Sequence, residues 1–387
     1  MTLQQQRLTK RFQSLISAAQ RSVFPCFAFQ EVISLASHQR TGSLGIIMHL
    51  KSSFLLLFAS VLLCLAAVES PVGVLKPRSY RILHPSGTLG TDYGPAYAIN
   101  NAGQVVGGAN RPGTDGYEAY VFDVKRGARF LPKIPGARHT DATAINSRGE
   151  IMGSTHTNDY ATTLFWSRTG ELTVLVPPPG WRNANGVSLN DRGQICGALQ
   201  NPGGVIAGFI WDAANGFQVI SNYGVVMGLN RWGTFVGGVP GGLDLVLVPG
   251  DGGASTALPQ EFRTVPNRIL RTEVLVGWSA SDNGVQAQVF SARAGLQPLP
   301  RLYDLPSNDN AFSVNRRGLI VGDSHDAAVL WKDGRVYNLN AVRPADTEWL
   351  HLSSARDIND KGWIVGVASR SDRLNATSFL LIPREQD

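Results

Sequence analysis

The sequence predicts an all-β fold: a seven-bladed β-propeller of four-stranded antiparallel blades, closed by an N-terminal strand that pairs with the last blade. Three observations lead to this prediction. A phrase with one Asn and two Gly at fixed positions recurs along the chain in steps of 40–46 residues. Each step also holds a second pair of strand-like segments, so it provides four strands, named A to D in chain order. The last step lacks strand D, and the unassigned segment 79–83 would complete it and remove the exposed edges.

The recurring phrase is typical of a tight hairpin between strands A and B. The clean copies stand at Asn100/Gly103/Gly107, Asn146/Gly149/Gly153, Asn190/Gly193/Gly197, Asn230/Gly233/Gly237, Asn315/Gly318/Gly322 and Asn359/Gly362/Gly366. Asn favours the first position of a type I turn, and Gly favours the fourth, where a left-handed backbone costs it little. We expect the second Gly to let a neighbouring backbone come close. A decayed copy carries Leu270, Glu273 and Gly277, so a looser turn is expected there.

The second hairpin of each step, between strands C and D, carries a column of aromatic residues. We expect these in the core rather than on a ligand-stacking ladder: Phe122, Trp166, Trp211, Phe290 and Trp331. Cys196 falls in a strand B column that is otherwise filled by Val and Met. It is therefore expected to be a small buried thiol rather than a nucleophile.

The phrase A-x-A-I-N-x-x-G-x-V-V-G, followed by an Ala- and aromatic-rich strand ending in Phe or Trp, resembles the repeat of the HAF-repeat family of predicted bacterial extracellular proteins. The likeness covers roughly residues 78–387, in six clear copies and one decayed copy. The resemblance implies a secreted repeat protein with no established catalytic residues to carry over. Motif residues such as Asn100 and Gly103 are interpreted as turn formers.

The N-terminal part of the chain is interpreted as a leader. Residues 1–47 are an upstream extension, made only if translation begins before Met48. Residues 48–70 hold a basic flank, a 15-residue apolar run at 54–68 and small residues at its end. This pattern predicts either a cleaved signal peptide or a retained N-terminal anchor. The propeller domain is expected over 78–387, in a secreted, extracellular or periplasmic protein that contacts the membrane only where the leader is uncleaved.

The formal charge of +6 does not indicate nucleic-acid binding. Residues 1–67 hold six basic side chains and one acidic one, which leaves 29 basic and 28 acidic side chains in the rest of the chain. The domain is therefore nearly neutral, and no nucleic-acid partner is expected. Cleavage of the leader would leave Cys196 as its one cysteine, so the domain must hold together by packing without an internal disulfide.

Any site is expected on the face that carries the B–C and D–A connections, because these vary in length while the A–B and C–D turns are short and uniform. In the second blade, His139 and Asp141 lie in the D–A connection, and His156 and Asp159 lie in the B–C connection. They are interpreted either as solvated loop polarity or as a site for calcium or zinc. His325, Asp326 and His351 lie further around the ring on the same face.

Two tryptophans in D–A connections, Trp181 and Trp349, offer a second kind of site on that face. Exposed aromatic residues anchor partners or sugars, and they also pin long loops to a blade edge. Both interpretations stay open at this stage.

The sequence contains no Gly-x-Ser-x-Gly elbow, phosphate-binding Gly-Lys-Ser/Thr loop or His-Glu-x-x-His pair. We therefore expect a monomeric, non-catalytic recognition or scaffold propeller that binds a protein or a carbohydrate, with no required cofactor. The alternative is an extracellular hydrolase or lyase with a metal at the channel mouth, which rests on fold analogy. A purely structural role in the cell envelope is a third hypothesis.

Overall fold

The computed structural model describes residues 71–384, apart from 77–78, 92, 157–160, 243, 265–268, 270–273, 282–283, 304–306, 344–349 and 371–375. These residues form thirty strands and two short 3₁₀ helices, η1 (Ser86–Leu89) and η2 (Leu339–Val342), which confirms the all-β class. Within the described ranges, no helix has the length and apolar character needed to cross a membrane. The predicted segments 1–47 and 48–70 lie outside the described residues.

Consecutive strands pair antiparallel in four-stranded meanders, whose strands correspond to A, B, C and D. The first consists of β3 (Ala96–Ile99), β4 (Val105–Asn110), β5 (Tyr117–Asp123) and β6 (Gly127–Phe130). The second consists of β7 (His139–Ile145), β8 (Ile151–His156), β9 (Ala161–Trp166) and β10 (Leu172–Val174). The third consists of β11 (Asn183–Leu189), β12 (Ile195–Gln200), β13 (Ile206–Asp212) and β14 (Gly216–Ile220). The fourth consists of β15 (Val225–Leu229), β16 (Phe235–Gly238), β17 (Leu245–Val248) and β18 (Thr256–Ala257).

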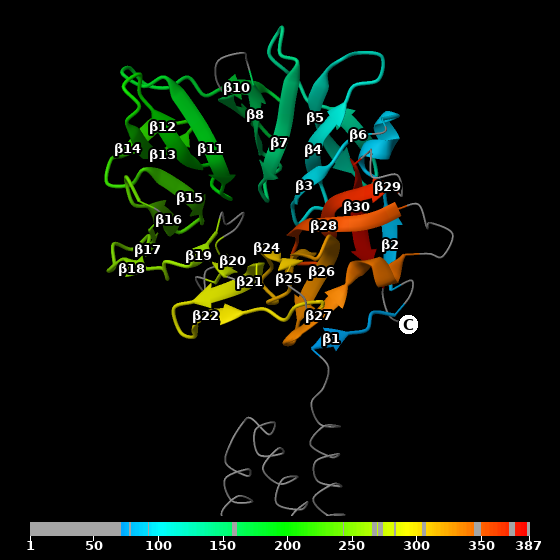
Figure 1. Ribbon diagram of the computed structural model, residues 1–387. Coiled ribbons are helices and arrows are strands. Elements are labelled where there is room, and N and C mark those ends of the chain that lie inside the picture. The colour runs from blue at the N-terminus through cyan, green and yellow to red at the C-terminus, as the bar shows by residue number, and fades with distance from the viewer. Residues whose placement is uncertain are drawn as a thin grey trace, which may run out of the picture. The chain divides into compact units, whose positions relative to one another are not determined.

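The pattern continues to the C-terminal end of the described chain. The fifth meander consists of β19 (Phe262–Arg263), β20 (Leu275–Ser281), β21 (Gly284–Ser291) and β22 (Gly295–Pro298), with β23 (Ser307–Asn308) parallel to β21. The sixth consists of β24 (Asn310–Val314), β25 (Ile320–Ser324), β26 (Ala327–Lys332) and β27 (Arg335–Asn338). The last combines β28 (Leu350–Ile358), β29 (Ile364–Arg370) and β30 (Ala376–Pro383) with β2 (Tyr80–Leu83). Figure 1 shows A strands such as β3, β7, β11, β15, β24 and β28 around a common centre.

The N-terminal segments of the described chain pair with its C-terminal half. β2 runs antiparallel to β30, with Arg81 opposite Ile382, as expected for the segment 79–83. The short strand β1 (Val72–Gly73) runs parallel to β27, with Val72 opposite Val336. Ordered pairing therefore begins before residue 78, the start expected from the repeats. A strand of two residues carries no periodic pattern, which is why the sequence did not indicate it.

The motif Asn residues form the A–B turns as predicted. In the first copy, the backbone oxygen of Asn100 accepts a hydrogen bond from the Gly103 N–H at 3.0 Å, and the Oδ1 atom accepts from Ala102 and Gln104, each at 3.0 Å. Gly103 has a φ of +88°, the left-handed backbone expected at this position. The turn of the decayed copy, at 270–273, lies outside the described residues.

The same Asn side chains also join neighbouring meanders. Each Nδ2 donates to the backbone oxygen of the motif Asn in the next meander, over 3.0–3.1 Å: Asn100 to Asn146, Asn146 to Asn190, Asn190 to Asn230, Asn315 to Asn359, and Asn359 to Asn100. The five donating side chains are buried, as is that of Asn230. The last of these bonds connects the C-terminal meander to the first. The motif Asn is therefore both a turn former and an inter-repeat link.

The second motif Gly lies where strands A and B approach closely, as predicted. A Cβ atom at Gly107, Gly153, Gly197, Gly277, Gly322 or Gly366 would overlap a backbone oxygen of the preceding strand. Strand A carries a bulge at most of these places, for example between Gly186 and Ser188 opposite β12. A bulge bends the inner strand and brings its backbone over the glycine.

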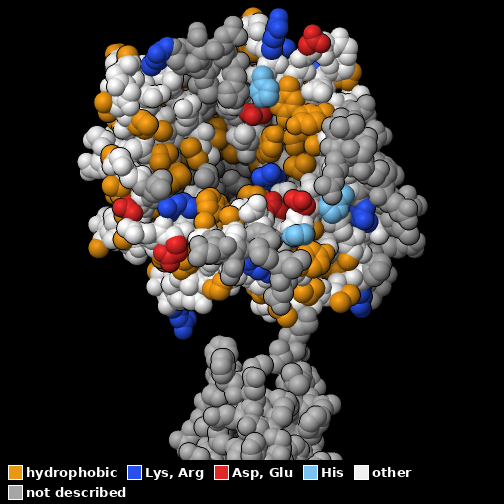
Figure 2. Space-filling model, in the orientation of Figure 1, with side chains coloured by type: hydrophobic (Ala, Val, Ile, Leu, Met, Phe, Trp, Pro, Cys, Tyr) orange, Lys and Arg blue, Asp and Glu red, His pale blue; other side chains and the backbone are white. Residues whose placement is uncertain are grey.

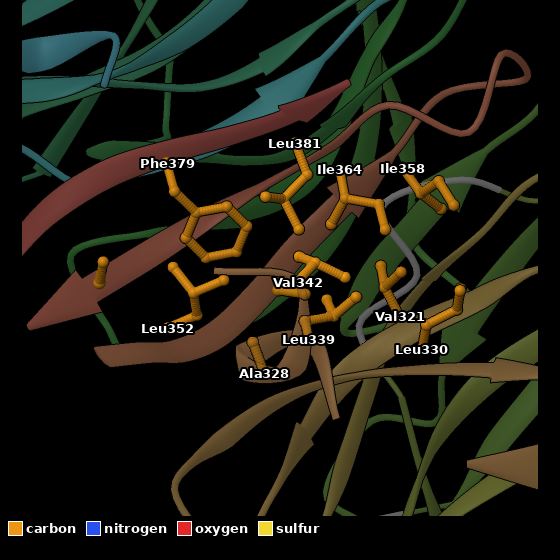
Figure 3. Packing of buried hydrophobic residues seen from close by; sticks show 12 residues of the cluster. Val321, Ala328, Leu330, Leu339, Val342, Leu352, Ile358, Ile364, Phe379 and Leu381 are labelled. Carbon is orange, nitrogen blue, oxygen red and sulfur yellow. The ribbon is translucent and has the colours of Figure 1, made fainter. Parts of the chain in front are cut away.

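The core lies between adjacent meanders. In Figure 3, Ala328 of β26 and Leu339 of η2 lie near Leu352 of the last meander, within the same cluster as Phe379. The predicted aromatic column is buried throughout: Phe122, Trp166, Trp211, Phe290 and Trp331 are each at most 7% exposed. Cys196 is fully buried, as predicted, and burial raises the pKa of its thiol to about 12.

Candidate functional site

The face with the B–C and D–A connections bears acidic, basic and histidine side chains among hydrophobic ones around its centre (Figure 2). One position of the repeat, three residues before the motif Asn, supplies side chains near the centre of this face, and we call these side chains the inner wall. At this position Tyr97, Phe312 and Arg356 each lie at a bulge of strand A, which turns a side chain out of the regular ladder. The Arg356 guanidinium lies 4.6 Å from the centre of the Phe312 ring, and its charge acts on the Tyr97 hydroxyl. The first, sixth and last meanders therefore bring these side chains together.

An aromatic cluster, comprising Tyr93, Tyr97, Tyr117 and His139, adjoins this wall. The Tyr117 and His139 rings are stacked, with centres 4.6 Å apart and planes 17° apart. Tyr93 lies 5.8 Å from Tyr117, between ring centres, and is 36% exposed. The hydroxyls of Tyr97 and Tyr117 are hydrogen-bonded at 3.2 Å. The cluster thus offers an exposed ring face next to a pair of phenolic hydroxyls.

The hydroxyls of Tyr97 and Tyr117 stay protonated at neutral pH. Burial raises the pKa of both Tyr97 and Tyr117 above the ordinary value of 10.0, and the nearby carboxylate of Asp141 raises each further. In the hydrogen-bonded pair, one hydroxyl donates and the other accepts, so the accepting hydroxyl retains its own O–H for a ligand. The cluster can donate hydrogen bonds but has no phenolate to act as a base.

Asp141 lies beside the cluster and is oriented by strand β8. Its Oδ1 atom accepts hydrogen bonds from the Ser154 N–H at 3.1 Å and from the Ser154 hydroxyl at 2.8 Å. His139 and Asp141 are two residues apart in β7, so both side chains project from the same side of that strand. Two of the predicted site residues are thereby brought to one place, next to tyrosines that the sequence did not single out.

A pocket of about 550 Å³ lies on the same face, between the β4–β5 hairpin and the connection from β6 to β7. Glu118, with a side chain only 2% exposed, joins its two walls: it accepts from Arg111 Nε at 2.7 Å and from Lys133 Nζ at 2.6 Å. Burial opposes ionisation of Glu118, yet the hydrogen bonds from Lys133 and Arg111 outweigh it and lower the pKa below its ordinary value. The carboxylate therefore stays charged and holds both cations.

The remaining predicted site residues contribute differently. Trp181 is partly buried and packs against the core cluster that the second and third meanders share, which supports the loop-pinning interpretation of this residue. Trp349, Asp159 and the side chain of His156 lie outside the described residues. Among the side chains that are described, no three His, Cys, Asp or Glu come together as metal ligands would. The predicted set of His139, Asp141, His156 and Asp159 thus has two described members.

The polar residues further around the ring have structural explanations. His325 and Asp326, with φ of +50° and +61°, form the two-residue turn between β25 and β26. Two successive residues with positive φ are typical of a type I′ hairpin. His351, expected in a D–A connection, lies in β28, and its Nε2 atom is 2.6 Å from the backbone oxygen of Asp326, which ties the start of β28 to this turn.

The tyrosine cluster and the pocket were not predicted from the sequence. Tyr97 and Arg356 occupy the position directly after the Ala that opens the recurring phrase. The residue at this position changes in type from copy to copy. That variation was a readable signal of a residue facing away from the core. Tyr93, Tyr117 and the Glu118 trio had no such signal, because their approach depends on loop conformation.

Comparison with known proteins identifies the fold. No family model and no curated protein matches the chain. The β-propeller domain of the Trilobed protease from Pyrococcus furiosus is similar to it with a TM-score of 0.51, at 11% identity, over 76% of this chain and 97% of that one.

Two oligogalacturonate lyase structures are similar to the same extent. The enzyme from Vibrio parahaemolyticus has a TM-score of 0.50 at 10% identity, over 79% of this chain and 97% of that one. A manganese complex has a TM-score of 0.50 at 13% identity, over 80% and 97% of the two chains. At such identities the likeness concerns the fold and not the activity. The described chain is an all-β protein with a β-propeller fold.

Proposed function

We propose that the chain is a seven-bladed β-propeller, closed by β2, that acts as a non-catalytic recognition module for a protein or a glycan. The pairing of β2 with β30 and the hydrogen bond from Asn359 to Asn100 support closure. Both join the last meander to segments near the start of the domain. Closure gives a rigid support for the variable connections, which suits recognition by side chains held in fixed positions.

The observation that carries the proposed function is the aromatic cluster at the inner edge of the variable face. An exposed ring beside protonated hydroxyls is a surface that binds sugars or the side chains of a partner. Asp141 and Arg356 add one charge of each sign close to Tyr97. Cys196, by contrast, is enclosed and protonated, so it offers no nucleophile.

The proposal is tested by a binding screen of the purified chain against cell-envelope glycans and co-secreted proteins. Tyr93→Ala is expected to weaken the binding found in the screen by about tenfold or more, because an exposed anchor ring is lost. Trp232→Ala is the matched control, since Trp232 is 43% exposed but lies in an A–B turn on the opposite face. Equal binding by both variants and the original chain would contradict a site on the variable face.

Metal analysis separates this proposal from the enzyme alternative. The purified, unchelated chain is compared with the Asp141→Ala and His139→Ala variants. Stoichiometric calcium or zinc that both substitutions remove would favour a metal-dependent hydrolase or lyase over simple recognition.

We further propose that the protein is exported, with 48–70 as its signal or anchor. Fractionation of cells that express the chain with and without that segment tests this proposal.

A further inference from the structure

The pocket between the first and second meanders has a charge pattern that the aromatic cluster does not explain. Three cations border it, Arg111, Lys133 and Arg138, together with the carboxylates of Asp115 and Glu118. Glu118 is nearly inaccessible, with its side chain 2% exposed, whereas the side chains of Arg111 and Lys133 are 41% and 36% exposed. The charge that the pocket presents to solvent is therefore predominantly positive.

The two paired cations are held in place before any ligand arrives. Glu118 binds Arg111 through Nε, and the Arg111 guanidinium also lies 4.2 Å above the centre of the Phe130 ring. A guanidinium has five N–H donors, so the donors on its two Nη atoms remain for another acceptor. Arg111 thus loses little side-chain freedom when it binds an anion, which lowers the cost of binding.

The surroundings restrict which anion the pocket takes. Asp115 and Glu118 offset two of the three cations, so the five side chains have a net charge of +1, which matches a single carboxylate. The backbone at this edge is already paired, since the Tyr117 N–H donates to the Arg138 oxygen at 2.9 Å. A peptide therefore has no free strand edge to extend here, and recognition falls to side chains.

We propose that this pocket binds the carboxylate of an acidic saccharide, a uronic acid unit of a longer glycan. The inference rests on the proposed recognition function and names its ligand class. Glu118 and Tyr117 are successive residues of β5 and point to opposite sides of it. A glycan that crosses this edge meets cations on one side of the strand and the aromatic cluster on the other. Sugar rings stack on aromatic faces, while each carboxylate forms charge-assisted hydrogen bonds.

The proposal is tested by isothermal titration calorimetry of the full chain with a uronic acid tetrasaccharide, its fully methyl-esterified counterpart, hexaglutamate and inorganic phosphate. The acidic tetrasaccharide is expected to bind at least about tenfold more tightly than the ester, and added salt should weaken this binding. Arg138→Gln should weaken it by about tenfold without unfolding the protein, because the exposed Arg138 is not bound to Glu118. Arg192→Gln, the same charge removal in an A–B turn, should leave it unchanged.

Each other outcome overturns the inference in a recognisable way. Equal binding of ester and acid, or an Arg138→Gln variant that binds as well as Arg192→Gln, would exclude the pocket as a carboxylate site. Tighter binding of hexaglutamate would indicate an acidic protein instead, and equal binding of phosphate a general anion site. If the tetrasaccharide fails to bind while another ligand binds in a Tyr93-dependent manner, the recognition function stands and the uronate inference falls.

Discussion

The two faces of the propeller are built on different rules, and the third meander shows both. Towards one face, Asn190 and Gly197 hold fixed positions of the repeat. Asn190 is buried and hydrogen-bonded to the neighbouring meander, and Gly197 lies close to the backbone of strand A of the third meander. On the other face, Asn201 and Gly203 form an exposed hairpin whose turn contacts stay within the loop. Residues of the same type therefore hold the fold together on one face and only shape a loop on the other. Because the loop residues of the second face are not needed to join meanders, they can vary, and this is why we place the proposed binding site there.

The largest expected difference between the faces comes from adding one methyl group. In Gly197→Ala the new Cβ would overlap the backbone oxygen of Asn185, and neither strand moves without breaking the β11–β12 ladder. We expect a loss of about 3 kcal/mol in the free energy of unfolding, measured by chemical denaturation. Gly203→Ala meets its nearest atom at 3.4 Å and has no positive φ, so it should change stability by less than about 0.5 kcal/mol. Equal losses would mean that the close approach at Gly197 is not a constraint.

A second prediction separates turn formation from the inter-repeat link. Asp accepts hydrogen bonds in a type I turn as well as Asn does, but its carboxylate has no N–H to donate. Asn190→Asp keeps the bonds from the Arg192 and Gln194 N–H groups, and it loses the two bonds that Nδ2 donates, to the Asn230 oxygen and to Gln194 Oε1. We expect a loss of about 2 kcal/mol, because a buried carboxylate would then face a carbonyl oxygen.

Asn201→Asp is the control for this prediction in the same meander. The Asn201 Oδ1 atom accepts from the Val205 N–H at 2.9 Å, and no inter-repeat bond depends on its amide group. Its unfolding free energy should stay within about 0.5 kcal/mol of the original chain. Should Asn190→Asp be equally harmless, the motif Asn would be a turn former alone, which is the role that the sequence suggested.

The contrast between the faces also explains what the sequence predicted well. Spacing and turn chemistry are local, so the left-handed Gly103, the close approach at Gly107 and the buried Cys196 followed from the repeat itself. The bond from Asn100 to Asn146 spans 46 residues and depends on how neighbouring meanders stack. No pattern within one repeat specifies that contact.

The candidate site was predictable from the sequence only in part. His139 and Asp141 were expected in the D–A connection, but both lie in β7, whose ladder with β8 extends to His139. Their partner Tyr117 lies in strand C of the preceding meander, and it reaches His139 through a single parallel pairing between β5 and β7. Such a contact depends on the relative position of two meanders, which residue types alone do not encode.

The smallest predicted effect concerns Glu118, a buried charge on the variable face. Lys133 and Arg111 hold its pKa below the ordinary value of 4.5, so its contribution to stability is complete above that pH and is lost as the pH falls through the lowered pKa. Glu118→Gln keeps the shape and removes the titrating group. At pH 7 we expect the variant to be about 1 kcal/mol less stable, a modest value because both cations are partly exposed.

The pH dependence distinguishes this explanation from a change in packing. As the pH falls well below 4.5, Glu118 of the original chain becomes protonated and loses its ion pairs, so the difference between the two proteins should shrink towards zero. Denaturation curves measured at several pH values between 3 and 7 would show this convergence. A constant difference across the series would mean that the stability difference does not come from the charge of Glu118. The cations around the pocket would then not depend on its charge for their position, and the preorganisation assigned to Arg111 would have to come from Phe130 alone.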